Sequence, residues 1–345
     1  MEKFKAFCKR KNIEVSAKRY GIDALGAMAQ GLFCSLLIGT IIKTLGAQLG
    51  VPFLTDIGTY AMSVSGPAMA IAIGYALKAD PMVLFSLAAV GWAANAEGGA
   101  GGPLAVLIIA ILAAECGKAV SKETKIDILA TPLVTIFAGV GLSMLIAAPI
   151  GAAASQVGTL IMWATEQAPL VMGILVSVIV GVALTLPISS AAICAALGLT
   201  GLAGGAAVAG CCAQMIGFAV MSYKENGVGG LIAQGIGTSM LQIPNVMKHP
   251  QILIPPTVAA IVAGPISSAA FKLLSNAAGS GMGTSGFVGV LMTYSESVKE
   301  LGVGRTVGGL IVCFVVIPAV VSLGVSEFMR KKGWIKPGDM KINTN

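Results

Sequence analysis

The sequence has little charge and few aromatic residues for a chain of 345 residues. Asp, Glu, Lys and Arg together make up 11% of it, whereas a soluble domain carries about 25% charged residues. Aromatic residues make up 6%, hydrophobic residues 56%, and the mean hydropathy is +0.89. This composition excludes an ordinary water-soluble fold and indicates a protein that spans a membrane several times.

Motifs for catalysis and metal binding are also missing. The seven cysteines form no Cys-x-x-Cys pair and lie mostly in apolar runs, and His249 is the only histidine. This pattern predicts neither a disulfide framework nor a zinc site. The sequence contains no P-loop, no metalloprotease helix motif and no serine-hydrolase elbow. We therefore expect no catalytic site, no metal site and no cofactor.

Long apolar runs supply the membrane segments. They cannot be a cleavable signal peptide, because the first follows a charged stretch and further runs come after it. We predict an all-α polytopic membrane protein with about 8–10 transmembrane segments, some of them broken or re-entrant. Six runs are long enough to cross roughly 30 Å of hydrocarbon as helices: 24–42, 57–77, 128–150, 169–187, 252–271 and 306–326.

Positive charge is concentrated in three places. Residues 1–19 hold seven Lys and Arg, residues 330–341 hold five, and the loop at 118–127 holds three lysines. By contrast, 44–77 and 126–168 contain no Lys or Arg. By the positive-inside rule, we expect both ends and the 118–127 loop in the cytoplasm, which requires an even number of crossings.

These features divide the chain into three predicted parts. A basic cytoplasmic segment at 1–20 and a basic cytoplasmic tail at 330–345 flank a transmembrane domain at 21–329. The basic N-terminal segment is accompanied by no folded nucleic-acid reader, so we expect the lipid bilayer as a partner and no nucleic acid.

The hexapeptide PISSAA occurs at 187–192 and again at 265–270, each time before a glycine-rich segment, at 197–210 and 276–289. Proline frees backbone carbonyls, small residues allow close helix contact, and serine hydroxyls can either satisfy those carbonyls or contact a polar solute. Helix packing and a solute cavity therefore both remain open. The substrate-binding candidates are Ser189, Ser190, Ser267 and Ser268.

A second pattern recurs as NAEGGAGGP at 95–103 and NAAGSGMG at 276–283. The arms at 82–94 and 103–117 look too short for comfortable spans. Irregular backbone at membrane depth must be covered by protein or line a cavity, and such breaks point to transporter binding sites. We predict an internal pseudo-repeat and re-entrant backbone at Gly98, Gly99, Gly101, Gly102, Gly281 and Gly283.

Polar residues within apolar surroundings complete the candidate site. A carboxylate at membrane depth is costly unless it faces a cavity or a partner, so Glu97 is a candidate for solute binding; the alternative is pairing with a lysine or capping a half-helix. Gln242 and Asn245 flank Pro244 at a predicted helix break, and His249 is expected in a loop. The full set of further candidates is Asn95, Glu97, Gln242, Asn245, His249 and Asn276.

Three stretches also carry a family resemblance. The segment 84–129, IPNVMKHPQILIPPT at 243–257 and GMGTSGFVG at 281–289 resemble the enzyme IIC membrane proteins of phosphotransferase systems, in the branch that includes the perfringolysin O regulator. The similarity covers about residues 20 to 330. One departure is His249-Pro250-Gln251, where the family more often has Asn-Pro-Arg. The resemblance implies a multi-pass protein of the bacterial inner (cell) membrane, a homodimer, and re-entrant hairpins.

The resemblance implies a permease component that binds and translocates a small polar solute, a sugar. The ends are too short to form the phosphoryl-transfer domain of such systems, so separate IIA- or IIB-like phosphocarriers would be its partners. The alternative is a membrane-bound ligand sensor or regulator without transport. A passive channel is less favoured, because glycine-rich breaks resemble occluding gates.

Overall fold

The computed structural model describes residues 2–342. The outermost residues of the predicted basic ends, Met1 and 343–345, lie outside this range. From 2 to 342 the chain is built from helices and turns without a strand, and Gly201 and Ser275 form one isolated β-bridge. The prediction of an all-α fold is confirmed.

The helices confirm a multi-pass membrane protein. By length and composition, six helical runs of the described chain can cross a membrane. A seventh span results if α4 (Pro52–Ser63) and α5 (Ser65–Ala76), bent by 47° at their junction, count as one. A shorter apolar helix, α10, covers Pro169–Thr185. The six runs are Arg19–Leu49, Pro81–Val120, Asp127–Thr165, Gly201–Met221, Pro250–Phe271 and Val303–Lys331.

The chain forms two compact units. The first comprises Met1–Gly39 and Asp56–Ala154, and the second comprises Thr40–Thr55 and Ser155–Asn345. The long run Asp127–Thr165 passes from one to the other and contains a π-helical turn, η4, at Ser143–Ala147.

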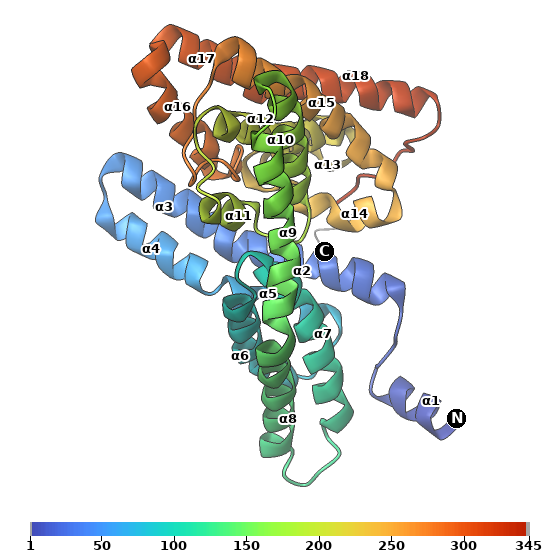
Figure 1. Cartoon of the computed structure of the whole chain (residues 1–345). Helices are drawn as coiled ribbons and strands as arrows, with labels where there is room; N and C mark the ends of the chain where they lie inside the picture. The colour runs from blue at the N-terminus through green and yellow to red at the C-terminus, as the bar shows by residue number, and fades with distance from the viewer. Residues whose placement is uncertain (1, 343–345) are drawn as a thin grey trace. The chain divides into compact units, whose positions relative to one another are not determined.

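The first unit packs short helices through small residues. A methyl group added at Gly66 or Gly91 would overlap the backbone carbonyl of the other, so α5 and the following helix can approach only because both positions are glycine. Its helices (Figure 1) are α1 (Glu2–Arg10), η1 (Arg19–Ala24), α2 (Leu25–Leu32), η2 (Phe33–Leu37), α6 (Pro81–Gly98), η3 (Gly99–Gly101), α7 (Gly102–Val120) and α8 (Asp127–Leu142), with parts of α3 (Ile38–Leu49), α4 and α9 (Ala148–Thr165).

The predicted break at 95–103 is present as the tip of a hairpin, whose arms α6 and α7 lie side by side (Figure 1). Gly99 has φ +51°, a conformation that favours glycine. The arms contain 18 and 19 residues, about 27 and 28 Å of helix. Both arms are longer than the predicted 82–94 and 103–117, because α6 continues through Asn95 to Gly98 and α7 extends from Gly102 to Val120.

The second unit is organised around α12 (Gly201–Met221), whose apolar window is 89% buried. It packs against α10, α15 (Ile254–Pro265) and α18 (Ile317–Lys331). The other helices of this unit (Figure 1) are α11 (Ser190–Ala196), α13 (Tyr223–Ile232), η5 (Ala233–Gly237), η6 (Ser239–Gln242), α14 (Ile243–Lys248), η7 (Pro250–Leu253), η8 (Ile266–Phe271), η9 (Ser285–Phe287), α16 (Val288–Leu301), α17 (Val303–Ile311) and η10 (Val312–Val316).

Candidate functional site

The first PISSAA copy lies at a true helix break. Helix α10 ends at Thr185, and Ser189 caps the short helix α11 by accepting a hydrogen bond from the Ala192 backbone nitrogen at 3.2 Å. Ser190 is buried, and its hydroxyl donates to the carbonyl oxygen of Gly281 at 2.8 Å. Proline thus ends one helix here, and a serine begins the next.

The second copy differs, which corrects the expectation of a break at Pro265. The helix continues through Pro265 into the π-helical turn η8, which ends before Lys272 with φ +58°. The Ser267 hydroxyl donates to the Gly205 carbonyl at 3.0 Å. Ser268 donates to the carbonyls of Pro169 at 3.2 Å and Gly264 at 3.1 Å. These hydroxyls satisfy the carbonyls of the widened turn and of neighbouring helices, so the chain stays helical past Pro265 to Phe271, where the predicted apolar run 252–271 also ends.

The segments that follow the two copies pair with each other. We call 197–201 and 272–284 the crossed loops. Backbone hydrogen bonds join Gly201 and Ser275 in both directions, at 2.8 and 3.2 Å, and the Ser280 hydroxyl donates to the Leu199 carbonyl at 2.7 Å. Only 197–200 of the predicted glycine-rich segment 197–210 is irregular, because α12 begins at Gly201.

Each PISSAA copy is bonded to the segment that follows the other copy. Ser190 of the first copy donates to Gly281, and Ser267 of the second donates to Gly205. Glycine is required at the first contact, because a Cβ at Gly281 would lie 2.5 Å from the Ser190 carbonyl oxygen. Gly283 has φ +55° and packs against Cys211. The two predicted breaks therefore form one region of irregular backbone in the second unit.

Several polar groups surround the crossed loops. The Asn276 side chain donates to Glu296 Oε1 at 3.2 Å, and its Oδ1 accepts from the Gly279 backbone nitrogen at 3.1 Å. The hydroxyls of Ser275 and Thr293 are buried without a hydrogen-bond partner. The sequence interpretation missed Glu296, Ser275 and Thr293. The stretch TYSESVKEL at 293–301 carries a polar signal, but it resembles an ordinary helix surface.

Four amide side chains, three of them buried and Asn226 half-buried, form a second polar group in the same unit. We call Asn226, Gln234, Gln242 and Asn245 the amide cluster. Gln242 is fully buried; its Nε2 donates to Gln234 Oε1 at 2.9 Å, and its Oε1 accepts from Asn245 Nδ2 at 2.8 Å. Gln242 and Asn245 were predicted together beside Pro244, where η6 runs directly into α14. Asn226 on α13 and Gln234 on η5 were missed, because isolated amide residues carry no periodic signal.

His249 lies between α14 and η7, in a loop as predicted. Its Nε2 is 3.5 Å from Asp339 Oδ1, and 39% of its side chain is exposed. The histidine therefore borders the C-terminal tail, and Asp339 is its acidic neighbour.

The remaining candidates belong to the first unit. Asn95 is half-buried on α6 and lies against Gly102, where an added Cβ would be 2.6 Å from Asn95 Oδ1. Glu97 is exposed near the hairpin tip. At Gly101 a Cβ would lie 2.9 Å from Gly151 Cα. The glycines of the tip therefore permit a tight turn against α9.

Ion pairs join the loop at 118–127 to other parts of the first unit. Arg10 and Lys11 of the N-terminal segment lie 2.8 and 2.5 Å from Glu123, and these two cations hold the pKa of that carboxylate below its usual value. Lys122 lies 2.5 Å from Asp80 and lowers the pKa of Asp80 in the same way. The basic N-terminus and this loop thus share one charged surface.

Comparison with known proteins gave one match. The search among curated proteins found none, and neither did the search among solved structures. A family model described as "Phosphotransferase system, EIIC" matches residues 22–342, nearly the whole chain, which confirms the family resemblance but does not address the branch. The membrane helices, the glycine-rich breaks and this match agree: the chain belongs to the phosphotransferase system EIIC family.

Proposed function

We propose that this chain is a membrane permease component that binds a small polar solute, a sugar, and carries it across the bacterial inner membrane. The family match over residues 22–342 is the observation that carries the proposal. The irregular backbone within an apolar helical unit supports it, because broken segments supply polar groups where regular helices would present none.

We place the solute at the crossed loops. Sugar hydroxyls both donate and accept hydrogen bonds, and Asn276 with Glu296 offers an amide and a carboxylate side by side. Ser189, Ser190, Ser267 and Ser268 act mainly through the backbone groups that they bind, which hold the loops in place. Gly281 and Gly283 let the loop backbone pack directly against Ser190 and Cys211, because a Cβ at either position would overlap these neighbours.

Two further groups of residues are proposed as solute contacts, each within its own unit. Gln242, Asn245 and His249 provide polar groups elsewhere in the second unit. In the first unit, Asn95 and Glu97 provide an amide and a carboxylate beside Gly98, Gly99, Gly101 and Gly102 of the hairpin tip. Separate IIA- or IIB-like phosphocarriers would phosphorylate the cargo, and the functional form would be a homodimer with both termini in the cytoplasm.

The test uses purified protein in liposomes and a panel of labelled mono- and disaccharides. Binding is measured by calorimetry and uptake by filtration, for the parent, Glu296→Gln and the matched control Glu300→Gln. Glu300 lies on the same helix but is exposed. Losing a charge-assisted hydrogen bond at Glu296 should lower affinity about 10-fold or more, and the control should leave it unchanged. Saccharide binding without uptake would instead favour a ligand sensor, and the absence of binding to any saccharide would refute a sugar as the solute.

A further inference from the structure

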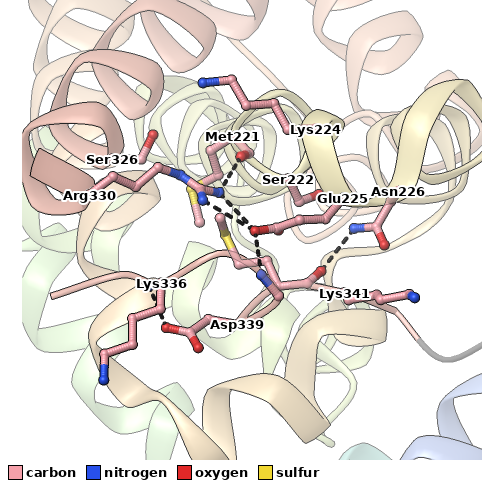
Figure 2. A network of polar contacts seen from close by, with 12 residues as sticks. Met221, Ser222, Lys224, Glu225, Asn226, Ser326, Arg330, Lys336, Asp339 and Lys341 are labelled. Atoms are coloured by element: carbon pink, nitrogen blue, oxygen red, sulfur yellow. Dashed lines mark hydrogen bonds and ion pairs between the residues drawn. The ribbon is translucent and has the colours of Figure 1, made fainter. Parts of the chain in front are cut away.

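The chain's own C-terminal tail packs against the second unit through a network of polar contacts (Figure 2), and we call the residues that contact it the tail site. After α18 ends at Lys331, the chain turns at Gly333 with φ +74°. The Trp334 ring packs edge-on against Phe328, at a centroid distance of 6.3 Å. Ile335 and Met340 are 1% and 0% exposed and belong to an apolar cluster with Phe218, Met221, Ile252 and Met329. Two tail side chains thus anchor an otherwise exposed segment.

The amide cluster binds the main chain of this tail rather than its side chains. Asn226 donates from Nδ2 to the Met340 carbonyl and accepts at Oδ1 from the Ile342 nitrogen, both at 2.8 Å. Gln242 donates to the same Met340 carbonyl at 3.0 Å. Asn245 donates to the Lys341 carbonyl at 3.0 Å. Side-chain amides therefore hold the tail through main-chain groups of Met340, Lys341 and Ile342.

A buried ion pair also contacts the tail. Glu225 Oε1 accepts from both terminal nitrogens of Arg330, at 3.2 and 3.1 Å, and from the Gly338 backbone nitrogen at 3.1 Å (Figure 2). Among the residues that the structure describes, the other Glu225 oxygen is buried without a hydrogen-bond partner. At the start of the tail, Gln251 donates to the Trp334 carbonyl at 3.0 Å. Together with the His249–Asp339 pair, these contacts follow the tail from its start to Ile342.

We propose that the tail site is a peptide-binding site, that residues 334–342 are its displaceable ligand, and that the tail acts as an autoinhibitory strap. The autoinhibitory role rests on the proposed function, because Gln242, Asn245 and His249 are proposed solute contacts. Met340 and Lys341 carbonyls accept from the amides that a sugar hydroxyl would use. Tail and solute therefore compete, and the solute reaches the amide cluster only when the strap leaves.

The first experiment measures strap release in the full-length chain. In a cysteine-free background, Met340→Cys reports exposure through its rate of maleimide labelling, and Ile335→Cys serves as a second reporter. Asn226→Ala removes two hydrogen bonds to the tail and should speed labelling about 10- to 100-fold. The matched control is Lys224→Ala, because Lys224 pairs with Glu327 and donates to none of the tail residues up to Ile342 that the structure describes. Equal labelling rates in both variants, with either reporter, would overturn the proposal.

The second experiment supplies the strap in trans. A protein truncated after Lys332 should bind a synthetic peptide of residues 334–342. A Gly338→Pro peptide should bind at least 10-fold more weakly, because it lacks the nitrogen donor to Glu225 and cannot adopt the φ of +96° at this position. The peptide-binding site would be overturned if the Gly338→Pro peptide bound as tightly as the parent peptide. It would also be overturned if a folded truncated protein bound no peptide. If the truncated protein does not fold, the labelling rates alone test whether the tail can be displaced.

The competition is tested separately with the saccharide panel. The truncated protein should bind the transported saccharide more tightly than the full-length chain, and added peptide should reverse the gain. If the peptide binds but leaves saccharide affinity unchanged, the autoinhibitory role is overturned while the peptide site stands. If no saccharide binds to any form, the proposed transport function fails. The labelling and peptide results still decide whether the tail is a displaceable ligand of the peptide-binding site.

Discussion

Gly281→Ala should destabilise the second unit by disrupting the contact between the crossed loops and the first PISSAA copy. The added Cβ would lie 2.5 Å from the Ser190 carbonyl oxygen and 2.6 Å from the Ala191 nitrogen, and neither backbone atom can move cheaply. Overpacking of this kind costs about 1–3 kcal/mol. The shift would also break the hydrogen bond between the Ser190 hydroxyl and the Gly281 carbonyl, which are 2.8 Å apart. Losing this bond lowers the stability by about 1 kcal/mol more. We expect a total loss of about 2–4 kcal/mol in the free energy of unfolding.

The assay is unfolding by sodium dodecyl sulfate in mixed micelles, followed by circular dichroism, with saccharide binding measured in parallel. Gly308→Ala is the control in the same unit, because a Cβ there meets nothing within 4 Å and a helical alanine is favoured over glycine by about 1 kcal/mol. Opposite signs for the two variants would support the close approach. A Gly281→Ala protein as stable as the parent would refute the reasoning about the crossed loops.

Three further predictions concern charge. Because Lys122 lowers the pKa of Asp80, their pair stabilises the folded state above the ordinary carboxylate pKa, and this contribution is lost as the pH falls through the lowered value. As the pH is lowered from about 5 to about 2, the carboxylate range, the midpoint temperature of unfolding should thus fall more steeply for the parent than for Asp80→Asn. Parallel curves of midpoint against pH would contradict this. Labelling of single cysteines should place the loop at 118–127 and the C-terminus in the cytoplasm, and a periplasmic C-terminus would require an odd number of crossings. Glu97→Gln should weaken saccharide binding about 10- to 100-fold through loss of a charge-assisted hydrogen bond, as calorimetry would show; unchanged affinity would remove Glu97 from the proposed solute contacts.

The candidate site was partly predictable because irregular backbone has a local chemical signature. Glycine at 98–102 and 276–284 and proline at 187 each disfavour a helix by themselves, so breaks at these places could be expected without knowledge of their partners. Pro265 shows the limit of this reasoning. There the serine hydroxyls and a π-helical turn supply the carbonyls with partners, and the helix continues to Phe271.

Composition and charge by themselves determined that this protein is an all-helical membrane protein, because the cost of placing polar backbone in hydrocarbon leaves few alternatives for such an apolar chain. Only the tertiary structure decided which groups meet. Ser190 binds a glycine 91 positions away, Asn276 meets Glu296, and Asn226 holds a tail more than 110 positions further on. Such contacts depend on how distant helices pack and on the loops that this packing brings together, and hydrogen bonds between distant residues leave no periodic or local trace in the sequence.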